Sequence, residues 1–308
     1  MTNSDELKYV LVTRETRLQE LVKRFNTWSQ AKFYLEHNQV DAEDYLREHD
    51  QYQSVILEAE RLLRNSGRFQ HLKRDYLPSY RFGMNDIVVI VGQDGLVANT
   101  LKYLNGQPVV GVNPDPLRWD GKLLRFEIEQ LSDVVKRIGR GSFQASEVVF
   151  ALAETNDGQT LLGINDLFIG PKSHTSAQYK ISWSGKSEFH SSSGVIVSTG
   201  FGSTGWFQSI LAGAIGVTGQ QSHKLQDGLA WDFPALQFAV REPFPSNTTG
   251  TELVIGQVTK EDPLVLESLM PENGVIFSDG IEQDFLKFNS GCIVSIGIAD
   301  RRGFVVTE

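Results

Sequence analysis

The segment from residue 87 to residue 91 constrains the fold more than any other part of the chain. Its sequence, Ile-Val-Val-Ile-Val, is apolar at every position. Such a run is typical of a parallel strand that is covered on both faces. A second apolar run, residues 108–112, follows a short predicted helix at about residues 97–104. The order strand, helix, strand predicts a βαβ unit within an open, mainly parallel α/β sheet.

The residues before this unit continue the alternation of strands and helices. Residues 9–12 form a short β-branched run, after which Thr16 and Gln19 have the spacing of a capping box. A helix is then predicted from apolar residues at helical spacing, namely Leu18, Leu21, Val22, Phe25 and Trp28. A second helix is predicted from about residue 41 to residue 65, with Gly67 as its stop signal.

The pattern changes near residue 125, after which short strands predominate. Asn-Asp-Gly at residues 156–158 is a strong hairpin signal between two of these strands. One predicted helix, at about residues 203–214, interrupts them. The predicted strands are residues 148–154, 160–169, 179–183, 194–199, 236–241, 252–258, 264–269, 275–278 and 292–298. We therefore predict a mainly-β, sandwich-like C-terminal domain at residues 121–308, after an α/β domain at residues 1–120, with the boundary in residues 115–121.

Composition limits the partners of the chain. Its 308 residues carry a formal net charge of −9. Nucleic acid and anionic membranes both favour clustered Lys and Arg, so neither is an expected partner. A small phosphorylated ligand remains possible, because a few local cations and backbone N–H groups suffice to bind it.

Several features favour a cytoplasmic location. Cys292 is the only cysteine, which excludes an intrachain disulfide and suits a reducing compartment. Its apolar neighbours suggest a small core residue. No apolar run approaches the roughly 18 residues of a membrane span, and residues 1–6 lack the features of a signal peptide.

The loop after residues 87–91 is the strongest candidate site. Gly92, Gln93, Asp94 and Gly95 lie where the buried strand ends, and open α/β folds bind ligands at that edge of the sheet. Gly92 and Gly95 are expected to allow positive φ and close approach to a phosphate chain. The helix that follows offers its N-terminal N–H groups to an anion. Asp94 is the group there that can accept a proton, although an aspartate in this position is also a common helix N-cap.

This loop resembles the Gly-Gly-Asp-Gly motif of the NAD kinase and diacylglycerol kinase superfamily. Other segments, in the same order along the chain, narrow the resemblance to the NAD kinase family. Residues 163–166, Gly-Ile-Asn-Asp, resemble its Asn-Glu/Asp motif, and residues 194–206 resemble its Gly-rich Ser/Thr stretch. Residues 277–280, Phe-Ser-Asp-Gly, resemble the Asp-Gly near its C-terminal strands. Residues 16–34 resemble the branch with mitochondrial-type enzymes and their bacterial relatives.

The resemblance implies an ATP-dependent kinase that converts NAD to NADP. Asp94 would accept the proton of the adenosine ribose 2′-hydroxyl, and phosphate positioning and charge neutralisation would supply most of the catalysis. Mg²⁺ would arrive on the ATP phosphates, with few protein ligands and no dedicated metal site. Arg14 and Arg17 are candidate phosphate contacts. The family also implies a homodimer or a higher homo-oligomer.

The dinucleotide would be bound by the later motifs. Asn165 and Asp166 would hold ribose hydroxyls, because an adjacent amide and carboxylate both donate to and accept from a diol. Their alternative is an Asx turn between strands. The adenosine part would contact residues of the Gly-rich stretch, namely Gly202, Ser203, Thr204, Gly205, Trp206 and Ser209. Trp206 would stack on the base; alternatively, Trp206 and Phe207 are core residues.

Three departures from the family pattern bear on this interpretation. Gln93 replaces the second glycine of the first motif, and its Cβ is expected to crowd the phosphate loop. Leu96 replaces the usual threonine, and Ser193 stands where many relatives carry an aspartate. Dinucleotide binding is therefore a safer prediction than turnover. A non-catalytic NAD- or NADP-binding protein and a kinase of a lipid or sugar hydroxyl are the alternatives.

Other nucleotide and metal motifs are absent or incomplete. Residues 200–205 fit Gly-x-Gly-x-x-Gly, but no acidic residue that ends a second strand follows about 20 residues later, near residue 220, as a Rossmann dehydrogenase requires. The histidines show no metal-ligand spacing, and the chain has no Walker A lysine motif and no cysteine pair for zinc.

Overall fold

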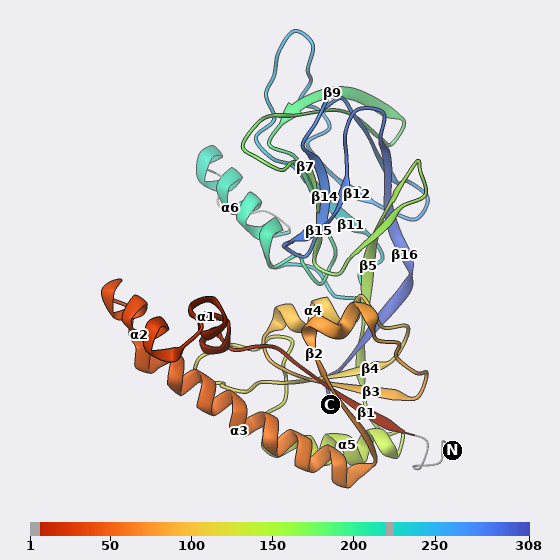
Figure 1. Cartoon of the computed structure of the whole chain (residues 1–308). Coiled ribbons are helices and arrows are strands. Elements are labelled where there is room, and N and C mark those ends of the chain that lie inside the picture. The colour runs from red at the N-terminus through yellow and green to blue at the C-terminus, as the bar shows by residue number, and fades with distance from the viewer. Residues whose placement is uncertain (1–6, 220–224) are drawn as a thin grey trace. The chain divides into compact units, whose positions relative to one another are not determined.

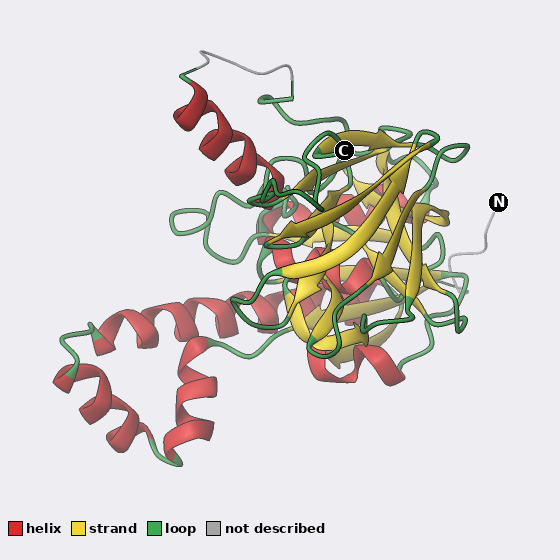
Figure 2. Ribbon diagram, turned by 90° about the horizontal axis from the view of Figure 1, so that it is seen from above, coloured by secondary structure: helices red, strands yellow, loops and turns green. Residues whose placement is uncertain are grey.

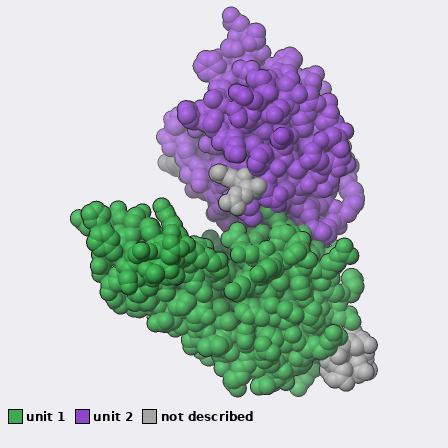
Figure 3. All heavy atoms as spheres, in the orientation of Figure 1, with its two compact units in different colours: residues 1–146, 304–308 green, residues 147–303 purple. Residues whose placement is uncertain are grey.

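The computed structural model describes residues 7–219 and 225–308. The prediction that the chain has no signal peptide depends on residues 1–6, which lie outside this range. The prediction that no acidic residue ends a strand near residue 220 depends in part on residues 220–224, which also lie outside it. The chain divides into two compact units (Figure 3). Unit 1 comprises residues 1–146 and 304–308, and unit 2 comprises residues 147–303.

Unit 1 is the predicted α/β domain. Its strands are β1 (Lys8–Thr13), β2 (Arg68–Lys73), β3 (Asp86–Val91) and β4 (Pro108–Val112). Its helices are α1 (Arg17–Phe25), α2 (Trp28–His37), α3 (Ala42–Ser66), α4 (Asp94–Leu101) and α5 (Leu131–Gly139), with short 3₁₀ turns at Arg74–Ser79 and Ile128–Gln130. The strands pair in parallel in the order β2-β1-β3-β4.

Helices cover both faces of this sheet, as the uniformly buried β3 requires (Figure 1). Alternate residues of β1, β3 and β4 form one core with α3 and α5, while α4 lies on the other face (Figure 1). Helix α4 begins at Asp94, three residues before the predicted start.

The N-terminal helices confirm the sequence signals in part. Thr16 and Gln19 form the predicted capping box, and α3 lies between an Asp41 N-cap and a Gly67 C-cap. The single predicted helix through Trp28 is instead two, because Asn26 adopts a left-handed φ of 64° and ends α1. Helices α1 and α2 lie away from the strands, beside the N-terminal end of α3 (Figure 2).

Unit 2 contains two sheets with a shared core. One sheet contains β5 (Ala145–Thr155), β6 (Thr160–Gly163), β8 (Ala177–Trp183), β9 (Lys186–Ser192), β13 (Leu264–Ser268) and most of β16 (Ile293–Val306). The other contains β7 (Asp166–Pro171), β10 (Val195–Ser198), β11 (Leu236–Val240), β12 (Ile255–Val258), β14 (Gly274–Ser278) and β15 (Ile281–Lys287). Inward-facing residues of both sheets meet in one hydrophobic cluster, so the sandwich-like prediction is confirmed.

The predicted hairpin at residues 156–158 joins β5 and β6. The predicted strand at residues 160–169 is two strands, β6 and β7, with a turn at Ile164 and Asn165. Helix α6 (Trp206–Thr218) is the predicted interruption, shifted by three residues at its start.

The units divide between Ser146 and Glu147, not within residues 115–121 as predicted. The reason is α5, which the sequence analysis did not predict. Its buried side chains, Leu131, Val134, Val135 and Ile138, belong to the same core as α3 and β3. In addition, the last residues of β16 pair with β4, which brings the C-terminus into unit 1.

Candidate functional site

Strand order in unit 1 creates a switch point between β1 and β3. The chain leaves β1 for β2 on one side and leaves β3 for β4 on the other, so the connections after these adjacent strands diverge. The crevice at such a point is where open α/β sheets bind ligands. The hydroxyl of Tyr52 joins the two strand ends, because it accepts from the backbone N–H of Arg14 at 3.0 Å and donates to the carbonyl of Val91 at 2.7 Å.

Asp94 lies at this point as the first residue of α4. Gln93, not Asp94, is the N-cap of α4, and it makes no side-chain capping bond. The N-cap alternative for Asp94 is therefore wrong. The half-buried carboxylate instead accepts a hydrogen bond of 3.1 Å from the backbone N–H of Leu123. Asp94 is thus oriented by a loop almost 30 residues later, at an exposed edge of the sheet.

The two glycines of the motif do not have the predicted conformation. Neither Gly92 nor Gly95 has a positive φ. A Cβ at Gly92 would lie 2.8 Å from Cδ2 of the buried Leu96, so the leucine side chain would have to shift to accommodate it. A Cβ at Gly95 would meet nothing within 4 Å. Leu96 therefore packs into the core, where its replacement of threonine fills the space beneath Gly92.

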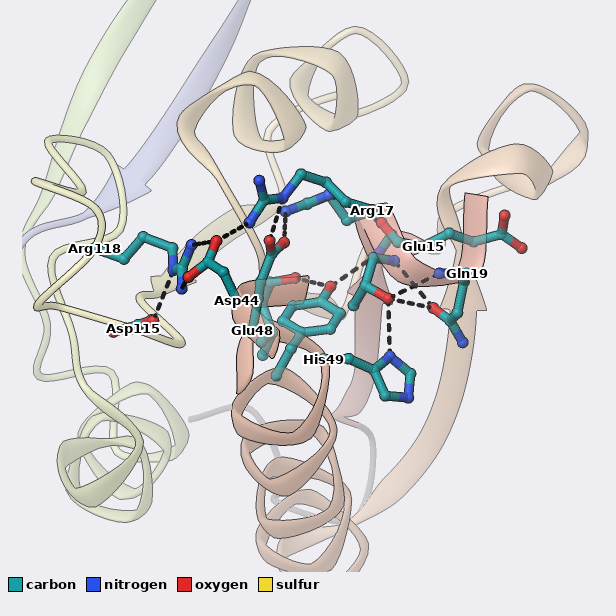
Figure 4. Close-up of polar contacts among 12 residues, drawn as sticks. Glu15, Arg17, Gln19, Asp44, Glu48, His49, Asp115 and Arg118 are labelled. Carbon is teal, nitrogen blue, oxygen red and sulfur yellow. Dashed lines mark hydrogen bonds and ion pairs between the residues drawn. The ribbon is translucent and has the colours of Figure 1, made fainter. Parts of the chain in front are cut away.

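A network of charged side chains borders the switch point (Figure 4). Glu48 of α3 pairs with both Arg14, at 3.3 Å, and Arg17. Asp44 pairs with Arg17 at 3.0 Å and with both terminal nitrogens of Arg118, at 2.6 and 2.9 Å. These bonds from Arg118 and Arg17 hold the pKa of the Asp44 carboxyl well below its usual range. The candidate phosphate contacts Arg14 and Arg17 are therefore neutralised in part by carboxylates of α3.

A cavity of about 350 Å³ lies beside these arginines. Its cationic lining comprises Arg14, Arg17, Lys73 and Arg74, while Glu15, Glu20 and Asp75 are the anions, and Gln93 completes the lining. Among the described residues, no acceptor lies within hydrogen-bond distance of the buried Nε of Arg14. The lining thus holds four cations and three anions, and two of the cations, Arg14 and Arg17, also pair with carboxylates of α3. A phosphate bound there would compete with these carboxylates for the arginines.

The second group of predicted residues lies in unit 2, at the turn between β6 and β7. Asn165 is half-buried and Asp166 is buried. The carboxylate of Asp279 accepts from the backbone N–H groups of Ile164, Asn165 and Asp166, at 3.0, 2.6 and 3.3 Å. The N–H groups of the turn are thus bonded to a side chain more than 100 residues away.

The Gly-rich stretch holds the carbonyl side of the same turn. The backbone N–H of Thr199 donates to the carbonyl of Asn165 at 2.9 Å, and its hydroxyl donates to the carbonyl of Ile164 at 2.5 Å. Gly202 packs directly on the turn, because a Cβ there would lie 2.0 Å from the carbonyl oxygen of Asn165. Asn165, Asp166 and Gly202 are therefore brought together as predicted.

The hydroxyl of Ser203 is engaged within unit 2, and the prediction that Ser203 contacts the dinucleotide stays a prediction. Its side chain is buried, donates to the carbonyl of Gly200 at 2.7 Å and accepts from the N–H of Leu229 at 2.7 Å. Its contacts are thus internal. Thr204 and Gly205 are exposed, and Gly205 is the N-cap of α6.

Trp206 and Ser209 lie on the first turns of α6 and line a second cavity of about 620 Å³, together with Arg241 and Pro243. The ring of Trp206 is half-buried and stacks on Phe168, with centroids 5.7 Å apart, and the Arg241 guanidinium lies 5.4 Å from its centroid. Phe207 is a core residue. Stacking of Trp206 on a base stays a prediction.

The sequence analysis missed several residues that shape these sites. Asp279 was noticed only as part of an Asp-Gly pair; that pair, which is typical of a left-handed turn, was the available signal, and Asp279 does have a φ of 55°. Lys73 is the last residue of β2 and Arg74 follows it; β2 is an edge strand whose residues are mostly polar and which was not predicted. No local pattern points to Tyr52 or Arg118, whose partners are distant in sequence.

Metal and membrane features can be tested only in part. Within residues 7–219 and 225–308, no group of three or more His, Cys, Asp or Glu side chains could hold a metal ion. Among the helices of the same residues, none combines the length and hydrophobicity needed to cross a bilayer.

The chain was compared with known proteins by sequence and by structure. By sequence it matches no protein-family model and no curated protein. Its structure is similar to that of yeast NADH kinase complexed with NADH, with a TM-score of 0.59 and 14% identity over 98% of this chain and 84% of that chain. It is also similar to an NAD kinase from Archaeoglobus fulgidus in complex with ATP, with a TM-score of 0.57 and 15% identity over 97% of this chain and 93% of that chain. This likeness establishes a shared fold.

Proposed function

We propose that this protein, which has the fold of NAD kinases, is itself an ATP-dependent kinase of the NAD kinase family. It would transfer the γ-phosphoryl group of ATP to the 2′-hydroxyl of the adenosine ribose of NAD and give NADP. The observation that carries this proposal is the position of Asp94 at the switch point of unit 1, in the same unit as a cation-lined cavity.

Asp94 is the proposed general base. The 2′-oxygen attacks the γ-phosphorus, the bond from that phosphorus to the bridging oxygen of ADP breaks, and the hydroxyl proton passes to the carboxylate. The hydrogen bond from Leu123 orients the carboxylate without taking all of its acceptor capacity. A positioned base contributes roughly 10²–10⁴-fold to the rate.

The cavity in unit 1 is the proposed site for the donor phosphates. Arg14, Arg17, Lys73 and Arg74 supply its positive charge, and the Gln93 side chain lines it as a neutral hydrogen-bonding group. The guanidinium groups of Arg14, Arg17 and Arg74 would donate charge-assisted hydrogen bonds to the phosphate oxygens. Mg²⁺ on the phosphates would supply further charge neutralisation, which suits a chain whose described residues offer it no dedicated cluster.

Unit 2 is proposed to bind the dinucleotide. Asn165 and Asp166 would bond the ribose diol, because one group both donates and accepts and the other accepts. Gly202 packs against this turn, Thr204 and Gly205 expose their backbone beside it, and Trp206 and Ser209 would contact the adenosine.

The decisive experiment follows NADP formation from NAD, ATP and Mg²⁺ with an NADP-specific dehydrogenase. Wild type is expected to make NADP, and Asp94→Asn to lose at least about 10²-fold in kcat. Asp133→Asn is the matched control, because Asp133 also lies in the first turn of a helix of unit 1 but is exposed and pairs with Lys136. It is expected to retain full activity.

Other outcomes favour the alternatives. Binding of NAD by calorimetry without any NADP would support a non-catalytic dinucleotide-binding protein, in which Gln93 and Leu96 have ended phosphate transfer. ATP consumption with a lipid or sugar hydroxyl, and none with NAD, would support a different kinase. Parallel assays with NADH test whether the reduced dinucleotide is also a substrate.

Assembly and location are further proposals. Homo-oligomerisation, which the family resemblance implies, is tested by light scattering of the purified chain. A cytoplasmic location rests on the single cysteine, Cys292, whose thiol pKa is raised by partial burial. Fractionation of the source cells tests it.

A further inference from the structure

Asp279 makes several hydrogen bonds with the backbone of the candidate ribose-binding turn. Its Oδ1 lies within 3.3 Å of the backbone nitrogens of Ile164, Asn165 and Asp166, and Oδ2 lies 3.3 Å from that of Ile164. Its own backbone N–H donates to the carbonyl of Asp166 at 3.0 Å. A carboxylate is the side chain that best accepts several N–H donors at once, because each bond is charge-assisted.

The connection between β14 and β15 brings Asp279 to this position. Residue register shifts between Phe277 and Ser278, and Asp279 and Gly280 both adopt left-handed φ, of 55° and 70°. Aspartate tolerates this conformation better than most residues, because its short polar side chain bonds locally. The side chain therefore turns back from β14 toward the end of its neighbour β7.

The opposite side of the turn is held independently. Thr199 donates hydrogen bonds to the carbonyl oxygens of Ile164 and Asn165, whereas the carboxylate of Asp279 accepts from the N–H groups. The backbone polar groups of the turn are thus bonded to two segments that are distant in sequence. What the turn presents outward is then set by its side chains, including the half-buried Asn165.

We propose that Asp279 is a positioning residue for dinucleotide binding: it fixes the Ile164–Asn165–Asp166 turn so that the side chains of Asn165 and Asp166 meet the ribose diol. This inference rests on the proposed function and assigns to Asp279 a role that acts through the turn, without contact with the substrate. A carboxylate needed only for stability would leave NAD affinity unchanged when it is replaced, while a positioning residue lowers NAD affinity and leaves the KM for ATP unchanged.

The test compares wild type with Asp279→Asn. Asparagine is nearly isosteric and also tolerates the left-handed conformation, so the change removes the charge and one acceptor without straining the backbone. Asp262→Asn is the matched control, because Asp262 also accepts a backbone N–H in unit 2, from Ser184 at 3.1 Å, in a different loop.

Three measurements are made on the full chain: hydrogen exchange of the amides at residues 164–166, NAD affinity by calorimetry, and kinetics with NAD and ATP varied separately. In Asp279→Asn we expect faster exchange at these amides, NAD affinity lower by about tenfold or more, and kcat and the KM for ATP within about twofold of wild type. Asp262→Asn is expected to match wild type in all of them.

Unchanged NAD affinity despite faster exchange would overturn the proposal, and so would equal losses for NAD and ATP. If wild type binds NAD but makes no NADP, the proposed kinase fails, and calorimetry alone still decides the role of Asp279. If wild type binds no dinucleotide, both proposals fail.

Discussion

The two candidate sites are built in opposite ways. In unit 1, Asp94 and the arginines belong to short stretches that directly follow strands, and side-chain ion pairs to Asp44 and Glu48 hold the charges in place. In unit 2, the turn at Asn165 is held through its backbone, by the side chains of Asp279 and Thr199. In unit 1 the charged side chains are held in place, whereas in unit 2 the backbone of the turn is held in place.

The difference should be visible in how much stability is lost when residues of each site are substituted. Ion pairs that are partly exposed contribute little to stability and weaken with salt or acid, so the charged network of unit 1 can rearrange around an incoming phosphate. Buried hydrogen bonds to backbone groups are costly to leave unmade. Substitutions around the turn of unit 2 are therefore expected to cost more than substitutions in the charged network of unit 1.

The largest effect is expected from Gly202→Ala. The new Cβ would lie 2.0 Å from the carbonyl oxygen of Asn165, so the backbone must move. Overpacking of this kind lowers the free energy of unfolding by about 3 kcal/mol, which urea denaturation measures. Gly213→Ala is the control, because a Cβ at Gly213 of α6 meets nothing within 4 Å. Equal stability of Gly202→Ala and wild type would show that the turn is not tightly held.

Thr199→Val should have the next largest effect. It keeps the shape of the fully buried side chain but leaves the carbonyl of Ile164 and the N–H of Gly202 without the hydroxyl. We expect a loss of about 2 kcal/mol in the free energy of unfolding and weaker NAD binding. Thr199→Ser, which retains the hydroxyl, should recover most of both. Similar behaviour of the two variants would rule out the hydroxyl as the cause.

Tyr52→Phe tests the bond between the strand ends of unit 1. The variant removes the partner of the Arg14 N–H and of the Val91 carbonyl, and should lose about 1.5 kcal/mol. Burial raises the pKa of Tyr52 to about 12. The folded state then holds this proton more tightly than the unfolded state, whose tyrosine titrates near 10. The Tyr52 contribution is thus lost as pH rises from about 10 toward 12.

The variant should accordingly lose less stability than wild type over that alkaline range, as followed by circular dichroism. Tyr76→Phe, which alters an exposed ring, is the control. An identical alkaline slope in Tyr52→Phe and wild type would contradict the assignment.

The smallest effect is expected from Asp44→Asn. Because Arg118 and Arg17 lower the pKa of Asp44, its contribution is present above the unfolded pKa of about 4 and is lost as pH falls below it. At neutral pH we expect a loss below about 1 kcal/mol, since the pairs are partly exposed. The difference from wild type should shrink in 1 M salt. A loss as large as that of Thr199→Val would erase the contrast between the two sites.

Local signals in the sequence predicted a large part of the molecule. The apolar run at residues 87–91 identified the central parallel strand, and the loop after it identified the position of Asp94 at the sheet edge. Capping residues located α1 and α3, and Asn-Asp-Gly located the β5–β6 hairpin. These predictions succeeded because neighbouring residues alone decide strand burial, caps and tight turns.

Other features depended on packing between distant segments. The amphipathic α5 lay where strands predominate, so the unit boundary was placed too early. Gly92 was expected to have a positive φ, but it does not, and it instead packs closely against the side chain of Leu96. The partners of the Ser203 hydroxyl, the carbonyl of Gly200 and the N–H of Leu229, were also beyond what the sequence predicted.

The sequence by itself determined the strand that precedes Asp94, the hairpin at residues 156–158 and much of the order of the elements, because each follows from hydrophobic periodicity or turn chemistry within a few residues. The tertiary structure decided which distant groups orient those residues. Leu123 holds Asp94, Tyr52 joins the strand ends, and Asp279 and Thr199 hold the turn at Asn165. A single hydrogen bond leaves no periodic trace in a sequence, so its partner is known only when folding brings the two segments together.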